Sequence, residues 1–445
     1  NTGSTNLTSP RRIIFVARSF AGESIRSAHA ITKLENVELF GICDHPLTNE
    51  QTIFRDIVCV GDTHDSDQLL AAAKQLQQKH GPLKKIVTTY ETLLEPVAQT
   101  VEALGLAGMN VATVRRALNK SSLIATLREA GISTAQSLVC TDETQARRFA
   151  QELGYPVVLK PLNGSGGLAT WSVRNDSELN LALELTELSS ARPLLVEECL
   201  FGEEVSIDTI TIANEPRFYS ICCYSPPILA AIQNPAIQWC CVMPRDISDK
   251  VYQPLIAQGL DAVRALSVGD AMTHMEAFLM NGRVCFTDAT LRPAGARIAP
   301  MLAYAYDMDP YLAWARATLD ACFDGPWKRK FAVGTIFLHG AGSGTVESVS
   351  GFETVEKKLR EAVVDARLPR AGAMKASTYT GDGYVTVRHP ETTVVEEALD
   401  FIAQTIRINY SNFETSVTLR DEWTRRLQYD RIYKPVWEID SNLIM

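Results

Sequence analysis

The sequence lacks several patterns that would place it in a common class. It has no C-x-x-C pair and no H-x-x-x-H pair, although it contains ten cysteines and seven histidines. Most of the cysteines lie in apolar runs, so we expect buried free thiols and no zinc site. The loop after the first predicted strand, Ser19–Gly22, has no G-x-G-x-x-G fingerprint. This disfavours a nicotinamide dinucleotide, even though Asp44 follows the second predicted strand.

Long apolar runs and an excess of basic residues are also missing. No uninterrupted apolar run reaches the ~18–20 residues that a membrane span requires. The formal net charge is −9, whereas a nucleic-acid-binding protein usually carries a basic stripe. Residues 1–10 are polar and contain no signal-peptide core, so they are predicted to form a flexible tail. We therefore expect a cytoplasmic protein that binds neither membranes nor nucleic acid, and a homodimer stays open.

The chain does contain enough apolar residues to fill two or three domain cores. Its 445 residues are 46% hydrophobic and 21% charged, with both signs mixed. Over residues 11–118, apolar strands alternate with amphipathic helices, for example a strand at Val37–Cys43 and a helix at 66–80. This alternation predicts an open α/β domain with a parallel sheet, whose strand-end loops face a ligand.

The pattern changes after residue 118. Residues 119–200 are predicted to form a linker helix and then, from about 133, a small α+β lobe of two strands and two helices with a mobile glycine-rich loop. Over 201–330, apolar segments that alternate with polar turns predict a large antiparallel sheet. Residues 331–445 contain further strands and two or three helices, which we expect to form a C-terminal α+β lobe.

A lysine ends a buried strand of the small lobe and is followed closely by a glycine-rich loop. Lys160 follows the apolar run that starts at Pro156, and the loop consists of Asn163, Gly164, Ser165, Gly166 and Gly167. Buried strands rarely end in an unpaired charge, and glycines let backbone amides approach a ligand closely. With Lys120, at the start of the linker helix, the stretch predicts an anion cradle. It is not a Walker P-loop, and each lysine taken alone also fits a solvated surface position.

Carboxylates follow at spacings that suit a nucleotide and a metal ion. Glu197 and Glu198 end an apolar strand, and Glu204 follows Glu197 by seven residues. Carboxylates so placed can bracket the adenine and the ribose of a nucleoside. Glu276 lies in a predicted strand, and Asp288 ends the next one. On facing strands these two would converge on Mg²⁺, which prefers carboxylate and phosphate oxygens.

The order and spacing of these motifs resemble the ATP-grasp superfamily of carboxylate–amine ligases, over about Arg12 to Asp324. The strand with His274 and Glu276, and the long C-terminal extension, are most similar to the amino-acid (dipeptide) ligases of the bacilysin-synthesis type. The resemblance implies an ATP-grasp fold of α/β and α+β parts. These parts are an N-terminal pre-ATP-grasp domain, a small lid lobe, a large antiparallel catalytic sheet and a C-terminal lobe.

The resemblance also implies a set of ligands. Lys120, Lys160 and the Asn163–Gly167 loop would hold the phosphates of ATP. The backbone around Glu197, Glu198 and Leu200 would contact adenine, and Glu204 would contact ribose. Mg²⁺ (or Mn²⁺) would be bound by Glu276, Asp288 and Thr290, and the reacting carboxyl group by Arg292. His274 or a nearby carboxylate would accept the proton of the amine.

This chain departs from the family in its second metal-binding segment. That segment usually has the pattern Glu-x-Asn-x-Arg, whereas here it contains Asp288, Thr290 and Arg292. Aspartate and threonine can both ligate Mg²⁺, so the resemblance still implies an active enzyme, with the position of the second metal left open. The implied reaction is formation of an amide (peptide) bond between two amino acids, or an amino acid and a small carboxylic acid. It would proceed through an acyl phosphate and release ADP and phosphate.

Three alternatives stay open from the sequence. The enzyme could be a carboxylase that uses bicarbonate or a ligase of the purine-pathway type. The chain could also be a nucleotide-binding regulatory protein that has lost catalysis through the changes at Asp288 and Thr290.

Trp239 and the turn at Pro226–Pro227 are candidates for lining a substrate pocket, although ordinary packing explains them equally well.

Overall fold

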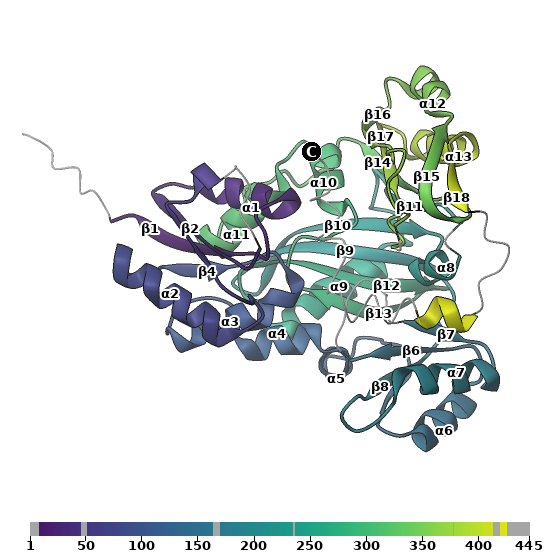
Figure 1. Ribbon diagram of the computed structural model, residues 1–445, viewed down its shortest axis with the longest axis horizontal. Coiled ribbons are helices and arrows are strands. Elements are labelled where there is room, and N and C mark those ends of the chain that lie inside the picture. Colours follow the sequence, from purple (N-terminus) through teal and green to yellow (C-terminus); the bar gives the residue numbers. More distant parts are fainter. Residues whose placement is uncertain are drawn as a thin grey trace, which may run out of the picture.

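The computed structural model describes residues 9–45, 51–162, 170–234, 236–376, 378–412 and 419–424 (Figure 1). Strands of these residues pair into a parallel sheet at the N-terminal end, a small antiparallel sheet in the lid lobe, an eight-stranded antiparallel sheet, and a two-stranded sheet near the C-terminal end. The expected α/β and α+β architecture, with a large antiparallel sheet, is confirmed.

The N-terminal domain has the strand order β3-β2-β1-β4, with every pair parallel. Local capping residues set the ends of helix α2. At its start, Asp65 accepts hydrogen bonds from the backbone N–H groups of the first turn, and at its end Gly81 adopts a positive φ of 101°. Its elements are β1 (Arg11–Val16), α1 (Gly22–Thr32), β2 (Val37–Cys43), β3 (Asp56–Cys59), α2 (Ser66–His80), β4 (Lys85–Val87), α3 (Leu94–Ala103) and α4 (Val111–Leu118), with short 3-10 turns at Gln51–Ile53 and Glu91–Leu93.

The lid lobe has four strands rather than the two that the sequence predicted, in the order β5-β8-β6-β7. One of the two additional strands is β8, the apolar segment that ends at Glu197 and Glu198. The prediction missed the other, β7, because it has only three residues and follows shortly after the glycine-rich loop. The elements of this region are α5 (Lys120–Glu129), β5 (Ser137–Cys140), α6 (Glu143–Leu153), β6 (Val157–Pro161), β7 (Trp171–Val173), α7 (Asp176–Thr186) and β8 (Leu194–Glu198).

A helical segment from the C-terminal end of the chain completes the lid core. Residues 419–424 are helical and lie beside β7, where Figure 1 shows them in yellow. Trp423 is 1% exposed within the lid core, and its ring centroid lies 6.1 Å from that of Trp171. Arg420 donates two hydrogen bonds of 2.8 and 2.7 Å to Glu184 of α7. The segment therefore belongs to the lid lobe in space, although the sequence analysis placed it in the C-terminal lobe.

The large sheet has the order β13-β12-β9-β10-β11-β14-β17-β16. Helix α9 packs against one face, and the other face packs against α10 and α11 beside the N-terminal domain. The predicted boundary at residue 330 divides this sheet, because β11 pairs with β14 on the far side of that boundary. The elements up to that point are β9 (Glu203–Ile212), β10 (Glu215–Ser225), α8 (Ile228–Gln233), β11 (Trp239–Met243), α9 (Gln253–Leu266), β12 (Ala271–Met280), β13 (Arg283–Thr290), α10 (Ile298–Tyr306) and α11 (Pro310–Asp320).

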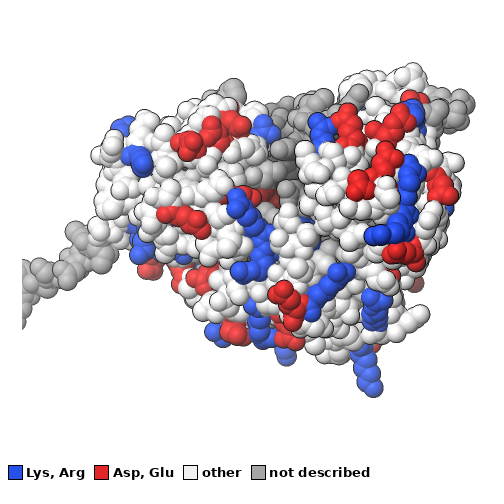
Figure 2. Space-filling view, turned by 90° about the horizontal axis from the view of Figure 1, so that it is seen from below, with Lys and Arg blue, Asp and Glu red and all other residues white. Residues whose placement is uncertain are grey.

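The rest of the chain extends the large sheet and adds a small two-stranded one. Helix α13 packs on β14 and β17, and β15 pairs with β18. These elements are β14 (Ala332–Leu338), β15 (Ser343–Ser350), α12 (Phe352–Leu359), β16 (Val363–Arg367), β17 (Gly383–His389), α13 (Thr392–Thr405) and β18 (Arg407–Asn412). On the face that Figure 2 shows, basic and acidic side chains are interspersed, and no continuous basic stripe crosses it.

Candidate active site

A cavity of about 490 Å³ lies between the lid lobe and the large sheet. Its walls come from the start of α5, from β6 and β8 of the lid, from α8, and from β9 to β13 of the large sheet, with Tyr379 of a C-terminal loop as a further wall. Most of the residues that the sequence singled out line it: Lys120, Lys160, Glu197, Glu198, Leu200, Glu204, His274, Glu276, Asp288, Thr290 and Arg292. The sites predicted at Asn163–Gly167 lie outside the described residues.

The two lysines come from adjoining segments, since the backbone N–H of Lys120 donates a 3.0 Å hydrogen bond to the carbonyl of Leu162, just after β6. Each lysine is held by a carboxylate. Lys160 is the second-last residue of β6, and its Nζ lies 2.6 Å from Oε2 of Glu197 on the neighbouring strand β8. Both side chains are nearly buried, at 9% and 5% exposure. Lys120 begins α5, and its Nζ donates a 2.7 Å hydrogen bond to Oδ2 of Asp288. Burial opposes the charge of Lys120, but Asp288 outweighs it and raises the pKa of the ammonium.

Three oxygen-bearing side chains stand together on β12 and β13. Glu276 and Asp288 are direct cross-strand partners, so their side chains share one face of the sheet. Thr290, two residues after Asp288, lies on the same face, and its Oγ1 is buried with no hydrogen-bond partner among the described residues. Two carboxylates beside an unsatisfied hydroxyl oxygen match the hard-oxygen preference of Mg²⁺, so these residues fit the predicted metal.

His274 lies in the same row, between two carboxylates. Its Nδ1 is 3.0 Å from Oδ1 of the fully buried Asp208, and its Nε2 is 3.5 Å from Oε1 of Glu276. Burial alone would lower the pKa of His274, but these two charges outweigh it and raise the pKa to about 10. An imidazole that is protonated at neutral pH cannot accept the proton of an amine. The geometry therefore argues against the predicted base role and favours a cation that orients Glu276.

Arg292 follows β13 and is anchored at the floor of the cavity. One guanidinium nitrogen donates a 2.7 Å hydrogen bond to Oε2 of Glu91, and the other donates one of 2.7 Å to the carbonyl of Pro293. Only 6% of the Arg292 side chain is exposed. The sequence analysis missed Glu91, which lies 201 positions earlier at the start of the 3-10 turn after β4, and no local pattern signals this pairing.

The predicted nucleoside residues lie where the lid meets the large sheet. Oε1 of Glu198 accepts a 2.8 Å hydrogen bond from the backbone N–H of Gln136 and lies 3.7 Å from the guanidinium of Arg283, so this carboxylate links the lid to the large sheet at the edge of the cavity. Glu204 is the second residue of β9 and accepts a 2.5 Å hydrogen bond from the backbone N–H of Ile228. Burial, with repulsion from Glu276, raises the pKa of Glu204 to about 8. A carboxyl group that is largely protonated at neutral pH can both donate to and accept from sugar hydroxyls.

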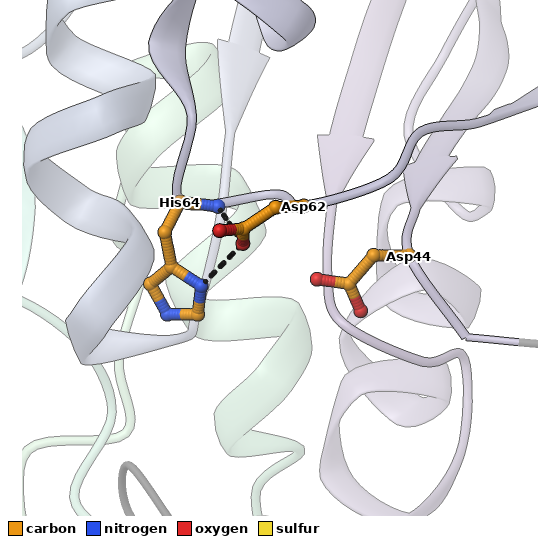
Figure 3. Close-up of side chains that lie close together, drawn as sticks. All are labelled: Asp44, Asp62 and His64. Carbon is orange, nitrogen blue, oxygen red and sulfur yellow. Dashed lines mark hydrogen bonds and ion pairs between the residues drawn. The ribbon is translucent and has the colours of Figure 1, made fainter. Parts of the chain in front are cut away.

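A second cluster of metal-ligating side chains lies in the N-terminal domain, outside this cavity. Asp44, Asp62 and His64 bring their ligand atoms within 4.8 Å of one another (Figure 3). Each is already committed to a protein group: Asp44 accepts from the backbone and hydroxyl of Thr63, Asp62 pairs with His64, and the far nitrogen of His64 lies 3.1 Å from Thr92. We therefore assign the cluster to holding the loops after β2 and β3.

Comparison with known proteins agrees with this geometry. The ATP-grasp domain model matches residues 125–296. The L-arginine-specific L-amino acid ligase of Bacillus subtilis is 26% identical over 230 residues, which are 50% of this chain and 55% of that protein. The chain thus matches about half the length of this curated relative. None of the described helices is long and apolar enough to cross a membrane.

Solved structures of low sequence identity share the fold. The L-amino acid ligase from Bacillus licheniformis superposes with a TM-score of 0.74 at 17% identity, covering 91% of this chain and 100% of that one. An N5-carboxyaminoimidazole synthase from Aspergillus clavatus, in complex with ADP and 5-aminoimidazole ribonucleotide, gives 0.67 at 16% identity, covering 89% and 99%. The family model thus identifies residues 125–296 as an ATP-grasp domain, and the solved structures show that most of the chain shares their fold.

Proposed function

We propose that this protein is an ATP-dependent ligase that joins a carboxylate to an amine through an acyl phosphate, with amino acids as its substrates. The observation that carries the proposal is the arrangement at one end of the cavity, where Lys120, Glu276, Asp288 and Thr290 lie close to the anchored Arg292. The names of the two amino acid ligases support amino acids as the substrate class.

The chemistry follows from the poor reactivity of a carboxylate, whose leaving group in a direct reaction would be oxide. Transfer of the γ-phosphoryl group of ATP to the carboxylate replaces that leaving group with phosphate. The two cavity lysines would neutralise the phosphates, and Arg292 would neutralise the charge that develops on the carboxyl oxygens. Bound Mg²⁺, held by the three oxygen ligands on β12 and β13, would supply further neutralisation of the transferred group.

The amine then attacks the acyl phosphate to give an amide, and the lid lobe has a role at this stage. Because water also attacks an acyl phosphate, the intermediate survives only where water is excluded. The cavity has the lid strands β6 and β8 on one side and the large sheet on the other, so closure of the lid would shield the intermediate.

The test is a matrix of amino-acid pairs assayed for phosphate release in the presence of ATP and Mg²⁺, with mass spectrometry of the products. We expect release to require both partners, and the product mass to equal the two amino acids less one water. Arg292→Lys should lower kcat more than it weakens ATP binding, because lysine keeps the charge but loses the planar fork. Arg316→Lys, on a surface arginine that pairs with Asp324, is the matched control.

A second candidate is a ligase or carboxylase of the purine-pathway type, which the fold shared with the N5-carboxyaminoimidazole synthase favours. Bicarbonate and ribonucleotide amines therefore belong in the same matrix. Phosphate release that depends on bicarbonate, and not on a second amino acid, would replace the first proposal with this one. ATP binding without turnover for any pair would instead support a regulatory role.

A further inference from the structure

The cavity continues past the reacting groups into an end walled by aromatic rings. Tyr224 of β10 and Trp239 of β11 lie on the same face of the large sheet as Glu204, and Tyr379 stands across from them. The ring of Trp239 lies 5.3 Å from that of Tyr224 and 4.9 Å from that of Tyr379, with edge-to-face geometry in both pairs. We call this end, with Ile228 and Ile232 of α8, the aromatic pocket.

The walls of the aromatic pocket are fixed in place. The carbonyl of Tyr379 lies 2.6 Å from Nε2 of the buried His339, which anchors the loop that carries the ring. Helix α8 is tied to the large sheet by the hydrogen bond from Ile228 to Glu204. A pre-formed pocket loses little conformational entropy when a ligand binds. Such a pocket can therefore discriminate between substrates by the size and shape of their side chains.

The position of the pocket defines the length of what it can hold. From Glu276 on β12 the sheet runs through β9 and β10 to β11, which carries Trp239. Three steps between neighbouring strands amount to about 14 Å across the sheet, and the pairing registers place Trp239 four residues along β11 from the position level with Glu276, which adds about 13 Å along the strands. A carboxyl group that is activated beside Glu276 and Arg292 is thus too far from Trp239 to touch it directly. A long side chain on the carboxylate substrate would fill that gap.

The side chains of the pocket are largely apolar, and their polar groups are the indole N–H of Trp239 and the hydroxyls of the two tyrosines. Its five side chains carry no charge, and Tyr224 and Trp239 are 4% and 1% exposed. Nε1 of Trp239 is buried and has no acceptor among the described residues. Buried indole N–H groups nearly always find a partner, so a ligand atom is the natural acceptor at the far end.

We propose that the aromatic pocket binds the side chain of the carboxylate substrate, and that this side chain is large, apolar along its length and ends in a hydrogen-bond acceptor, as in tyrosine. The proposal rests on the proposed function. It separates this chain from a relative that is named for arginine, since none of the five pocket residues supplies a carboxylate and the neighbouring Glu204 already accepts a hydrogen bond from the backbone of Ile228.

The first experiment measures kcat/KM for phosphate release with glycinamide as the amine, because an amide cannot supply the carboxylate. Tyrosine, phenylalanine and methionine should exceed glycine, aspartate and arginine by on the order of 10- to 100-fold. Trp239→Phe keeps an aromatic ring but removes the N–H, so it should reduce the preference for tyrosine over phenylalanine by about 2- to 10-fold. The KM for ATP should not change.

Two further variants keep the test decisive. Trp327→Phe, on a tryptophan that is 59% exposed and does not line the cavity, should behave as wild type. Ile232→Ala enlarges the pocket from α8 and should lower kcat/KM for tyrosine several-fold, which covers the case in which Trp239→Phe does not fold. Equal or better use of glycine, aspartate or arginine would overturn the assignment, as would a Trp239→Phe effect confined to the KM for glycinamide.

Calorimetry separates this inference from the proposed function. Tyrosine, glycine and arginine are each titrated into the protein with Mg²⁺ and a non-hydrolysable ATP analogue. Selective binding of tyrosine without any turnover would retain the pocket and refute the ligase. Turnover with no selectivity in binding or rate would retain the ligase and refute the pocket.

Discussion

The ion pair between Lys160 and Glu197 gives a prediction whose size follows from its burial. At 2.6 Å the gross attraction is about 6 kcal/mol at an effective dielectric constant of about 20, and desolvation of two nearly buried groups offsets most of it. Removing one partner leaves the other charge buried and unpaired, which typically costs about 3–5 kcal/mol. We therefore expect Glu197→Gln to destabilise the lid by about 3 kcal/mol without nucleotide, since glutamine keeps a hydrogen bond.

ATP should distinguish the two members of this pair. If Lys160 binds a phosphate, the nucleotide supplies the charge that Glu197→Gln has removed, so this variant should bind ATP at least as tightly as wild type. Lys160→Met loses the phosphate partner and should bind about 10- to 100-fold more weakly. The double variant Lys160→Met/Glu197→Leu removes both charges, so it should regain stability but not affinity.

The assays are chemical denaturation with and without an ATP analogue, hydrogen exchange of lid peptides, and calorimetry of nucleotide binding. The reasoning fails if Glu197→Gln costs less than about 1 kcal/mol without nucleotide, because the pair would then behave as an exposed one. It also fails if Glu197→Gln weakens ATP binding as much as Lys160→Met does. Unchanged ATP affinity in Lys160→Met would remove the phosphate role altogether.

Three further predictions concern the metal site, a buried histidine and the lid. Asp288→Asn should reduce Mg²⁺-dependent phosphate release steeply, Thr290→Val less, and Thr290→Asn least; an Asp288→Asn variant with near-full rate would place the metal elsewhere. Burial lowers the pKa of His339 to about 4, below its unfolded value of about 6.5, so the unfolded chain binds the extra proton first. Stability should fall by up to about 3 kcal/mol as the pH falls from about 6.5 to about 4, and denaturation curves of His339→Gln over this range should be flatter; equal slopes would contradict the assignment. Hydrogen exchange over residues 133–200 should slow when ATP and Mg²⁺ are added, and equal exchange in both states would argue against a closing lid.

Features that depend on local patterns could be predicted from the sequence. The strand at Val37–Cys43 and the helix at 66–80 have the predicted bounds, because alternation, capping and a terminal glycine are encoded within a few residues. Glu276 and Asp288 were placed on facing strands from their motif alone, and the register of β12 and β13 pairs them directly. The position of Lys160 near the end of a buried strand predicted a negatively charged partner. In the structure that partner is Glu197, and a bound phosphate would be a second one.

Features that depend on distant partners could not be predicted. The charge state of His274 is set by Asp208, which lies 66 positions earlier and gives no local signal. The continuation of the large sheet past residue 330 depends on the pairing of β11 with β14, which no pattern within either strand specifies. For Trp239 the sequence left packing and a substrate pocket equally open. The structure packs its ring against Tyr224 and places it in the cavity wall, and the substrate role stays a prediction.

The seating of Trp423 in the lid core sets an order of events during synthesis. Trp171 and Trp423 are 252 positions apart along the chain. At about 5–20 residues per second, a ribosome needs roughly 13–50 s to add that stretch. During this time the strands and helices of the lid are already outside the ribosome, but the apolar surface that Trp423 covers is still open to water. The lid can therefore reach its final packing only after Trp423 has been added, and a chain that stops before Trp423 would carry a complete large sheet beneath an unfinished lid.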